Sequence, residues 1–143
     1  IDIQQKHING KGIYVVSSGE QNNGIIGKTD LEAKVFKKNS ITIDMFGNVN
    51  LRDFEYKMVT HARVFNISYK ERDLTSEEGI YFSACLKYFN EVFSYGDMAS
   101  WNKSKNKDIV LPIKEPGIID FEFINSFIQI LEKIVLKNTF NLD

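Results

Sequence analysis

A polar segment with three glycines, residues 17–27, holds the first side chains that could recognise a ligand. Together with the lysine that follows, its hydrogen-bonding side chains are Ser17, Ser18, Gln21, Asn22, Asn23 and Lys28. Amide groups can pair with a base edge, as Asn and Gln do at adenine, and hydroxyl groups and amides also contact phosphates. A solvated loop has the same composition, so a plain surface loop with an Asn-Gly turn is the alternative.

A second candidate pair is His61 and Arg63, in a segment of strong β propensity, residues 56–69. If this segment is a strand, the two side chains share one face, because alternate residues of a strand point the same way. Arginine matches the O6 and N7 acceptors of guanine. The pair is therefore either a base-reading pair or a solvent-exposed strand edge.

The single Trp of the chain stands in the polar stretch SWNKSKNK, residues 100–107. If this stretch is extended, Lys103, Lys105 and Lys107 point to one side and form a row that could face phosphates. We expect Trp101 to be a large buried anchor for the loop. Stacking of Trp101 on a base or sugar is the alternative.

Motifs of catalytic and metal sites are largely missing from the sequence. It contains no GxxxxGK[ST], GxGxxG, HExxH or GxSxG pattern. The only histidines are His7 and His61, which excludes a three-histidine metal site, although a mixed site of His61 with carboxylates stays open. We therefore expect no metal, no cofactor and no catalysis. A small hydrolase remains a rival, with a triad of Ser17 or Ser18, His61 and Asp44.

Length and composition predict one ordinary globular domain that can bury its own core. The chain has 143 residues, of which 43% are hydrophobic and 26% charged. The single cysteine, Cys85, is expected on the apolar side of its helix, as a small hydrophobic residue of the domain core. A lone cysteine fits a reducing, cytoplasmic setting. The formal net charge of −1 argues against a strongly electrostatic nucleic-acid binder, but residues 98–114 hold four lysines against one acid.

Hydrophobic periodicity and turn signals predict an α+β fold. Expected strands cover residues 12–16, 41–45, 49–54, 56–69 and 109–113, with the FGN turn at 46–48 closing a hairpin. Thr75 and Glu78 match a capping box that opens a helix over residues 76–93. We expect a small twisted mixed β-sheet or barrel-like core, one packed helix and a long C-terminal helix.

The C-terminal helix is predicted to begin after Asp120 as its N-cap. Its hydrophobic residues form a heptad seam of Phe121, Ile124, Ile128, Leu131 and Val135, beside a second stripe of Phe123, Phe127, Ile130 and Ile134. This surface is too wide for one-sided packing, so we expect one part to pack on the domain and another to meet a partner helix. Residues 1–114 would form the main domain, and residues 115–143 a helix of the same folding unit.

Several segments, taken together and in order, resemble a known family. They are ITIDMFGNV (41–49), THARVF (60–65), YFSACLKYFNEVFSYGDMASWNKSKNKDIVLPI (81–113) and GIIDFEFINSFIQILEK (117–133). The combination of SWNK, LP and IDFEF is similar to the target recognition domain of bacterial restriction-modification specificity proteins. These are the S subunits of type I systems and their relatives in type IIG and BcgI-like enzymes. The resemblance covers most of residues 12–133.

The resemblance implies sequence-specific recognition of duplex DNA, without chemistry by the domain itself. Methyl transfer and cleavage would belong to partner methyltransferase and restriction subunits, or to fused catalytic domains, using S-adenosylmethionine and Mg²⁺. Long helices of this kind join two recognition domains and dock on the methyltransferase. Because a whole specificity subunit has two domains and two helices, we expect a half subunit, an excised domain or part of a fused enzyme.

On this interpretation the candidate residues divide into three groups. Direct readout of bases is expected from Gln21, Asn22, Asn23, Asn48, His61 and Arg63. Phosphate contacts are expected from Ser18, Lys28, Lys103 and Lys105. The heptad seam would bind a second recognition domain or a second copy of the chain. The alternative function is a protein-interaction module that uses the C-terminal helix and does not bind DNA.

Overall fold

The computed structural model describes residues 2–140, so residues 1 and 141–143, including the end of the predicted C-terminal segment, lie outside the description. Its strands are β1 (Ile13–Val16), β2 (Ile25–Thr29), β3 (Ser40–Ile43), β4 (Val49–Arg52), β5 (Tyr56–Met58), β6 (Phe65–Ile67), β7 (Ile113–Glu115) and β8 (Ile118–Ile119). Its α-helices are α1 (Ser76–Cys85), α2 (Phe89–Val92), α3 (Trp101–Ser104) and α4 (Phe121–Phe140), and its 3-10 turns are η1 (Gln5–His7), η2 (Gln21–Gly24) and η3 (Thr60–Ala62). The predicted α+β class is confirmed.

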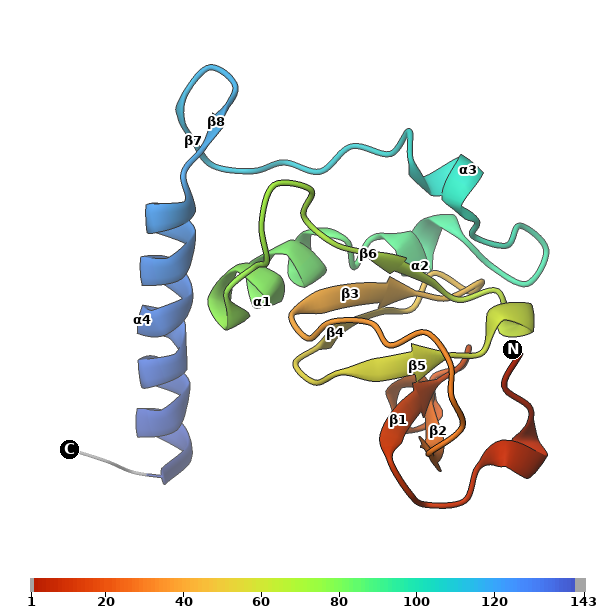
Figure 1. Ribbon diagram of the computed structural model, residues 1–143. Helices are drawn as coiled ribbons and strands as arrows, with labels where there is room; N and C mark the ends of the chain where they lie inside the picture. Colours follow the sequence, from red (N-terminus) through yellow and green to blue (C-terminus); the bar gives the residue numbers. More distant parts are fainter. Residues whose placement is uncertain (1, 141–143) are drawn as a thin grey trace.

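Two small sheets form the centre of the described part (Figure 1). One has the order β2-β1-β5 and is mixed, because β1 pairs antiparallel with β2 and parallel with β5. The other has the order β4-β3-β6 and is antiparallel. These strands do not close into a barrel, so the barrel-like alternative is not the one that this chain adopts within residues 2–140.

The main core lies between the antiparallel sheet and the helices α1 and α2. Its buried members are Ile41, Ile43, Val49, Leu86, Phe89, Phe93 and Ala99. The mixed sheet has its own buried clusters around Val15 and Tyr56. Burial of aliphatic and aromatic side chains on this scale supplies most of the free energy that holds such a domain together.

The predicted capping box at the start of α1 is confirmed. The Glu78 backbone N–H donates to Thr75 Oγ1 at 3.1 Å, and the Thr75 backbone N–H donates to Glu78 Oε2 at 3.0 Å. These reciprocal bonds satisfy two donors that a helix start would otherwise leave unpaired. The helix ends earlier than predicted, at Cys85, and resumes as the short α2 after a turn. Cys85 is only half-buried there.

The prediction of a continuous β segment over residues 56–69 is wrong. The chain leaves β5, forms η3, and enters β6 through Arg63 in the left-handed conformation, with φ 51°. The interruption has a topological cause, because β5 belongs to the mixed sheet and β6 to the antiparallel sheet. His61 and Arg63 therefore do not share a strand face.

Two further predicted segments differ from the structure. Residues 25–27, at the end of the predicted loop 17–27, belong instead to β2, because that strand pairs with β1. Residues 109–112 form no strand and cross the surface, with Val110 90% exposed, and only Ile113 enters the hairpin of β7 and β8. Pro112 has no N–H to give to a strand partner, which disfavours pairing at this point.

The helix α4 begins as predicted and packs against α1. The Phe123 backbone N–H donates to Asp120 Oδ1 at 3.0 Å, which confirms Asp120 as the N-cap. Ile124 and Ile128 are 0% and 6% exposed, so these members of the predicted partner seam belong to the internal interface of the domain. Leu131 and Val135, from the same seam, are 40% and 60% exposed.

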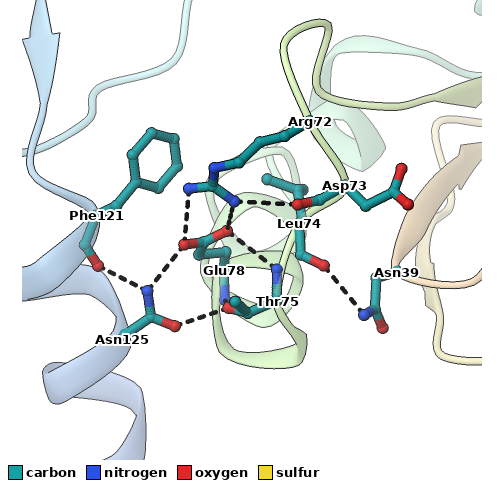
Figure 2. Close-up of polar contacts among 8 residues, drawn as sticks. All are labelled: Asn39, Arg72, Asp73, Leu74, Thr75, Glu78, Phe121 and Asn125. Carbon is teal, nitrogen blue, oxygen red and sulfur yellow. Dashed lines mark hydrogen bonds and ion pairs between the residues drawn. The ribbon is translucent and has the colours of Figure 1, made fainter.

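A buried carboxylate connects α4 to α1 and to the loop that precedes α1 (Figure 2). Glu78 accepts two hydrogen bonds from the Arg72 guanidinium, at 2.7 and 3.0 Å, and one from Asn125 Nδ2 at 2.8 Å. The Arg72 guanidinium also lies over the Phe121 ring, 4.4 Å from its centroid. The direction in which α4 leaves the domain is therefore fixed by polar as well as apolar contacts.

Candidate nucleic-acid interface

Four segments that are distant in the sequence meet at the end of the domain opposite α4. They are residues 17–24, 44–48, 60–63 and 94–104, and together they are called the loop end below. Figure 1 places α4 on one side of the sheets and α3 on the other. Hydrogen bonds join all four segments.

Asp44 is the centre of this arrangement. Its side chain is almost fully buried, and Oδ2 accepts from the Gly19 N–H at 2.8 Å and from Asn48 Nδ2 at 2.9 Å. Its Oδ1 accepts from the backbone N–H groups of Phe46 and Asn48 at 2.9 and 3.0 Å. Four donors thus hold one carboxylate, and the carboxylate in turn fixes the β3–β4 turn against the loop that follows β1.

Two more contacts attach the remaining segments. The Ser18 hydroxyl donates to the Ala62 carbonyl, which joins the first loop to η3. The Ala99 N–H donates to the Met45 carbonyl at 2.8 Å, which joins the 94–104 segment to the β3–β4 turn. Ser18 is therefore a positioning residue in this structure, with its hydroxyl already engaged by the backbone.

An open recess of about 640 Å³ lies at this end, on the side of β6. We call it the arginine recess, and its lining includes Arg63, Phe65, Tyr95, Met98, Trp101 and Lys103. The Arg63 guanidinium donates to the Met98 sulfur at 3.0 Å. A thioether is a weak acceptor, so a base edge or phosphate oxygen would be a better partner for this guanidinium. Lys103, in contrast, is paired with Asp97.

The expectation that Trp101 is a buried anchor is wrong. Ser100 caps α3, since its hydroxyl oxygen accepts from the Lys103 N–H, and the helix turns the indole outward to 56% exposure. The ring meets Phe65 edge to face, with centroids 6.5 Å apart. Ala99, only 2% exposed, is the residue that anchors this segment in the core.

The expected row of extended lysines is also wrong, because Lys103 lies in the helix α3, residues 101–104, and Lys105 is its C-cap. Lys103 lines the arginine recess, whereas Lys105 and Lys107 line a neighbouring apolar cavity of about 240 Å³. The Lys107 amino group lies 5.9 Å from the centroid of the Phe93 ring. Helical geometry separates side chains two residues apart, so the three amino groups do not form one row.

The polar loop after β1 places its amides outward. Gln21, Asn22 and Asn23 are exposed, and the two asparagines adopt left-handed φ angles of 49° and 52°. The Asn23 carbonyl accepts from the buried Arg52 guanidinium at 2.7 Å, so a side chain of β4 holds the loop backbone in place. Asn23 and Gly24 both have positive φ, as a tight Asn-Gly turn requires.

A second recess, of about 240 Å³, lies on the opposite flank of the β3–β4 turn, beside β4. We call it the amide recess, and its polar lining residues are Glu20, Asn23, Asn48, Asn50, Lys87 and Asn90. Sequence reasoning named Asn23 and Asn48 but missed Asn50 and Asn90. The signal for Asn50 in the sequence was its position two residues after Asn48, the last residue of the FGN turn. Nothing local marks Asn90, which reaches the recess from α2.

One family description matches nearly the whole chain. The sequence model for the type I restriction modification DNA specificity domain covers residues 1–139. The chain belongs to this family. This match confirms the family resemblance predicted from the sequence. The role of a domain of this family is sequence-specific DNA recognition within a restriction-modification system. The comparisons with curated proteins and with solved structures gave no match.

In this specificity domain, six of the predicted DNA contacts line neither recess: Ser18, Gln21, Asn22, Lys28, His61 and Lys105. Lys28 stands on β2, away from η2, with its amino group 4.4 Å from the centroid of the Tyr14 ring. His61 Nδ1 lies 2.7 Å from Asp2 Oδ2, in an exposed polar contact with the N-terminal segment. The residues of the hydrolase rival, Ser17 or Ser18 with His61 and Asp44, are not hydrogen-bonded to one another within residues 2–140: Ser18 donates to Ala62, Asp44 accepts from Gly19, and His61 contacts Asp2.

Two general features of the specificity domain concern residues 2–140. No helix in this part of the chain is long and apolar enough to cross a membrane. No group of three or more His, Cys, Asp or Glu side chains in the same residues is arranged to hold a metal ion.

Proposed function

We propose that the loop end is the surface with which this specificity domain reads duplex DNA. The observation that carries the proposal is that four loops distant in the sequence meet at one recess and are held together through Asp44. At the edge of this recess, the Arg63 guanidinium donates only to a weak acceptor, the Met98 sulfur. Loops fixed by a rigid scaffold are the usual place for recognition residues. The exposed tip of such a scaffold can enter a groove without disturbing the core.

Within this face, Arg63 would read a base and exposed cations would contact phosphates. A guanidinium held only by a thioether can exchange that contact for the O6 and N7 acceptors of guanine. Lys105 is exposed beside the recess and suits a phosphate. Lys103 would reach one only after leaving Asp97. Gln21 and Asn22, exposed on η2, would add contacts that depend on the bound sequence.

We further propose that α4 connects DNA recognition to partner subunits. Its outward side exposes Phe123, Phe127, Ile130, Leu131, Ile134, Val135 and Leu136, each at least 40% accessible. A continuous apolar surface of this kind is typical of a helix that meets a partner. It would bind a second recognition domain or a second copy and place a methyltransferase or endonuclease at the site. Residues 1–114 would then be the recognition part and residues 115–143 the helical part of one folding unit.

Selection from a random duplex pool at low salt, followed by sequencing of the bound fraction, tests this proposal. We expect a short motif to be enriched. Binding without enrichment would contradict base reading by this domain. No binding at low salt would favour the alternative, a protein-interaction module that acts through α4.

A further inference from the structure

The amide recess has no role in the contacts proposed above, yet it lies beside the same turn as the arginine recess. It is bordered by β4 at Asn50, by the β3–β4 turn at Asn48 and by α2 at Asn90. The turn is held close to α2, since a Cβ at Gly47 would overlap the Phe89 carbonyl. The recess is therefore built by three elements in fixed contact.

The amide groups of this recess are available to a ligand. The side chains of Asn50 and Asn90 have no hydrogen-bond partner among residues 2–140, and Asn90 is exposed. Asn48 donates through Nδ2 to Asp44 at 2.9 Å, which leaves its Oδ1 to accept from a ligand. The site thus offers both N–H donors and a fixed oxygen acceptor.

The charges of the recess argue against a phosphate ligand. Its lysine, Lys87, already donates to the Val49 carbonyl at 2.5 Å, and the carboxylate of Glu20 stands at the rim. A neutral group with an N–H donor and a nitrogen acceptor fits this lining better than an anion. Adenine presents that pair, N6 amino and N7, in the major groove, whereas cytosine presents only an amino donor there.

The sheet sets the distance between the two recesses. The amide recess adjoins β4 and the arginine recess adjoins β6, with β3 between them. Neighbouring strands are about 4.8 Å apart, so the two strands that border the recesses are about 10 Å apart. Bases along one DNA strand are spaced by about 3.4 Å, so this separation corresponds to about three base-pair steps.

We propose that the amide recess reads the major-groove edge of an adenine, about three base pairs from the base that Arg63 reads. This inference rests on the proposed DNA face of the loop end. It assigns direct readout to Asn50 and Asn90, and it gives Asn48 a fixed acceptor role. The β3–β4 turn then sits over the intervening base pairs.

The test uses the duplex enriched by selection, with 7-deazaadenine placed at each adenine in turn to remove N7. Wild-type protein should bind one such duplex about 10-fold more weakly. An Asn50→Ala/Asn90→Ala double variant should bind the unmodified duplex about 10-fold more weakly, and the same analogue should cause it little further loss. Asn138→Ala, an exposed asparagine on α4, is the matched control and should behave as wild type.

The outcomes separate this inference from the proposed function. The adenine readout by the amide recess would be overturned if a motif is enriched but 7-deazaadenine weakens binding at no position. It would also be overturned if 7-deazaadenine weakens binding equally for the wild type and the double variant. Either result would leave readout by Arg63 intact. A sensitive adenine that is not about three base pairs from the position read by Arg63 would overturn the spacing. Absence of any enriched motif would remove both proposals.

Discussion

Arg63 shows how a single residue can be prepared for recognition. Its left-handed backbone is uncommon for a long side chain and persists because Ala62 is fixed by Ser18 on one side and β6 follows on the other. The guanidinium then lies over the recess with a thioether as its contact. A two-pronged donor in this position can distinguish guanine from other bases, whereas a point charge cannot.

Replacement Arg63→Lys keeps the charge and removes the two-pronged geometry. We expect the preference at one base position to fall by about 1–3 kcal/mol while binding to other positions is unchanged. Competition binding with duplexes substituted one base pair at a time would measure this. Lys38→Ala, at an exposed lysine near the opposite end of β3, should leave every preference intact. Equal preferences for the Arg63→Lys variant and wild type would rule out base reading by Arg63.

Glu78 is the residue whose ionisation should matter most for stability. Burial raises its pKa, but hydrogen bonds from Arg72, the Thr75 backbone and Asn125 lower it more, so the net pKa lies below the ordinary value of 4.5. The folded state therefore favours the carboxylate more than the unfolded chain does. This contribution is complete above the unfolded pKa and is lost as the pH falls through the folded pKa.

Glu78→Gln should lower the free energy of unfolding by about 2 kcal/mol at neutral pH, because Arg72 keeps a weaker partner. The difference from wild type should shrink as the pH falls below about 4.5. Urea unfolding at several pH values measures both effects. Glu77→Gln, in the same turn of α1, is the control and should change little. A pH-independent difference would show that the charge of Glu78 is not what stabilises the contact.

At the scale of elements, the β3–β4 turn determines where both recesses lie. Gly47 has a φ of +82° and packs against the backbone at Phe89, so the turn fits only without a side chain at this position. Asp44 and Ala99 hold its two sides. The turn is the element on which the placement of Asn48 and Met98 depends.

Gly47→Ala should destabilise the domain by about 3 kcal/mol, from backbone strain together with overlap at the Phe89 carbonyl. Thermal unfolding would measure the loss, and DNA selectivity of the remaining folded protein should weaken as well. Gly96→Ala is the control, because a Cβ there meets only Ser94 Oγ at 4.0 Å. Similar stability of the two variants would contradict the role assigned to Gly47.

Elements with local signals could be predicted from the sequence, and those set by tertiary pairing could not. Thr75 with Glu78, and Asp120, marked the two long helices, because capping is a contact between near neighbours. The break at residues 60–63 has no such signal, since it exists only because β5 and β6 join different sheets. Ser100 was a local signal for the start of α3, but the spacing of the lysines favoured an extended strand instead. Asn90 lines the amide recess only because tertiary packing places α2 beside it.

At the scale of the whole molecule, α4 lies along one side of the domain (Figure 1). The apolar side chains on its outward side are largely exposed. Its polar attachment through Glu78 and Asn125 fixes its direction (Figure 2). A helix held in this way can keep a bound partner at a fixed distance from the DNA-binding face. The loop end and the helix surface are thus separate binding surfaces on one scaffold.

The exposed side of α4 should make the isolated chain self-associate at micromolar concentration. Ile130→Lys/Ile134→Lys places charges in that surface and should give a monomer, because two ammonium groups would have to be desolvated at the contact. Light scattering coupled to size-exclusion chromatography measures the mass. Gln129→Lys/Asn138→Lys adds the same charge at polar positions and should remain associated. A monomeric wild type would contradict association through α4.

Hydrogen–deuterium exchange of the free protein and of its complex with the enriched duplex tests the central claim most directly. If the loop end reads DNA, protection on binding should concentrate in residues 17–24, 44–48, 60–63 and 94–104. The segment 31–39 and the exposed side of α4 should exchange at the same rates in both states. Protection confined to α4 or to residues 31–39, with the four loops unchanged, would contradict the account.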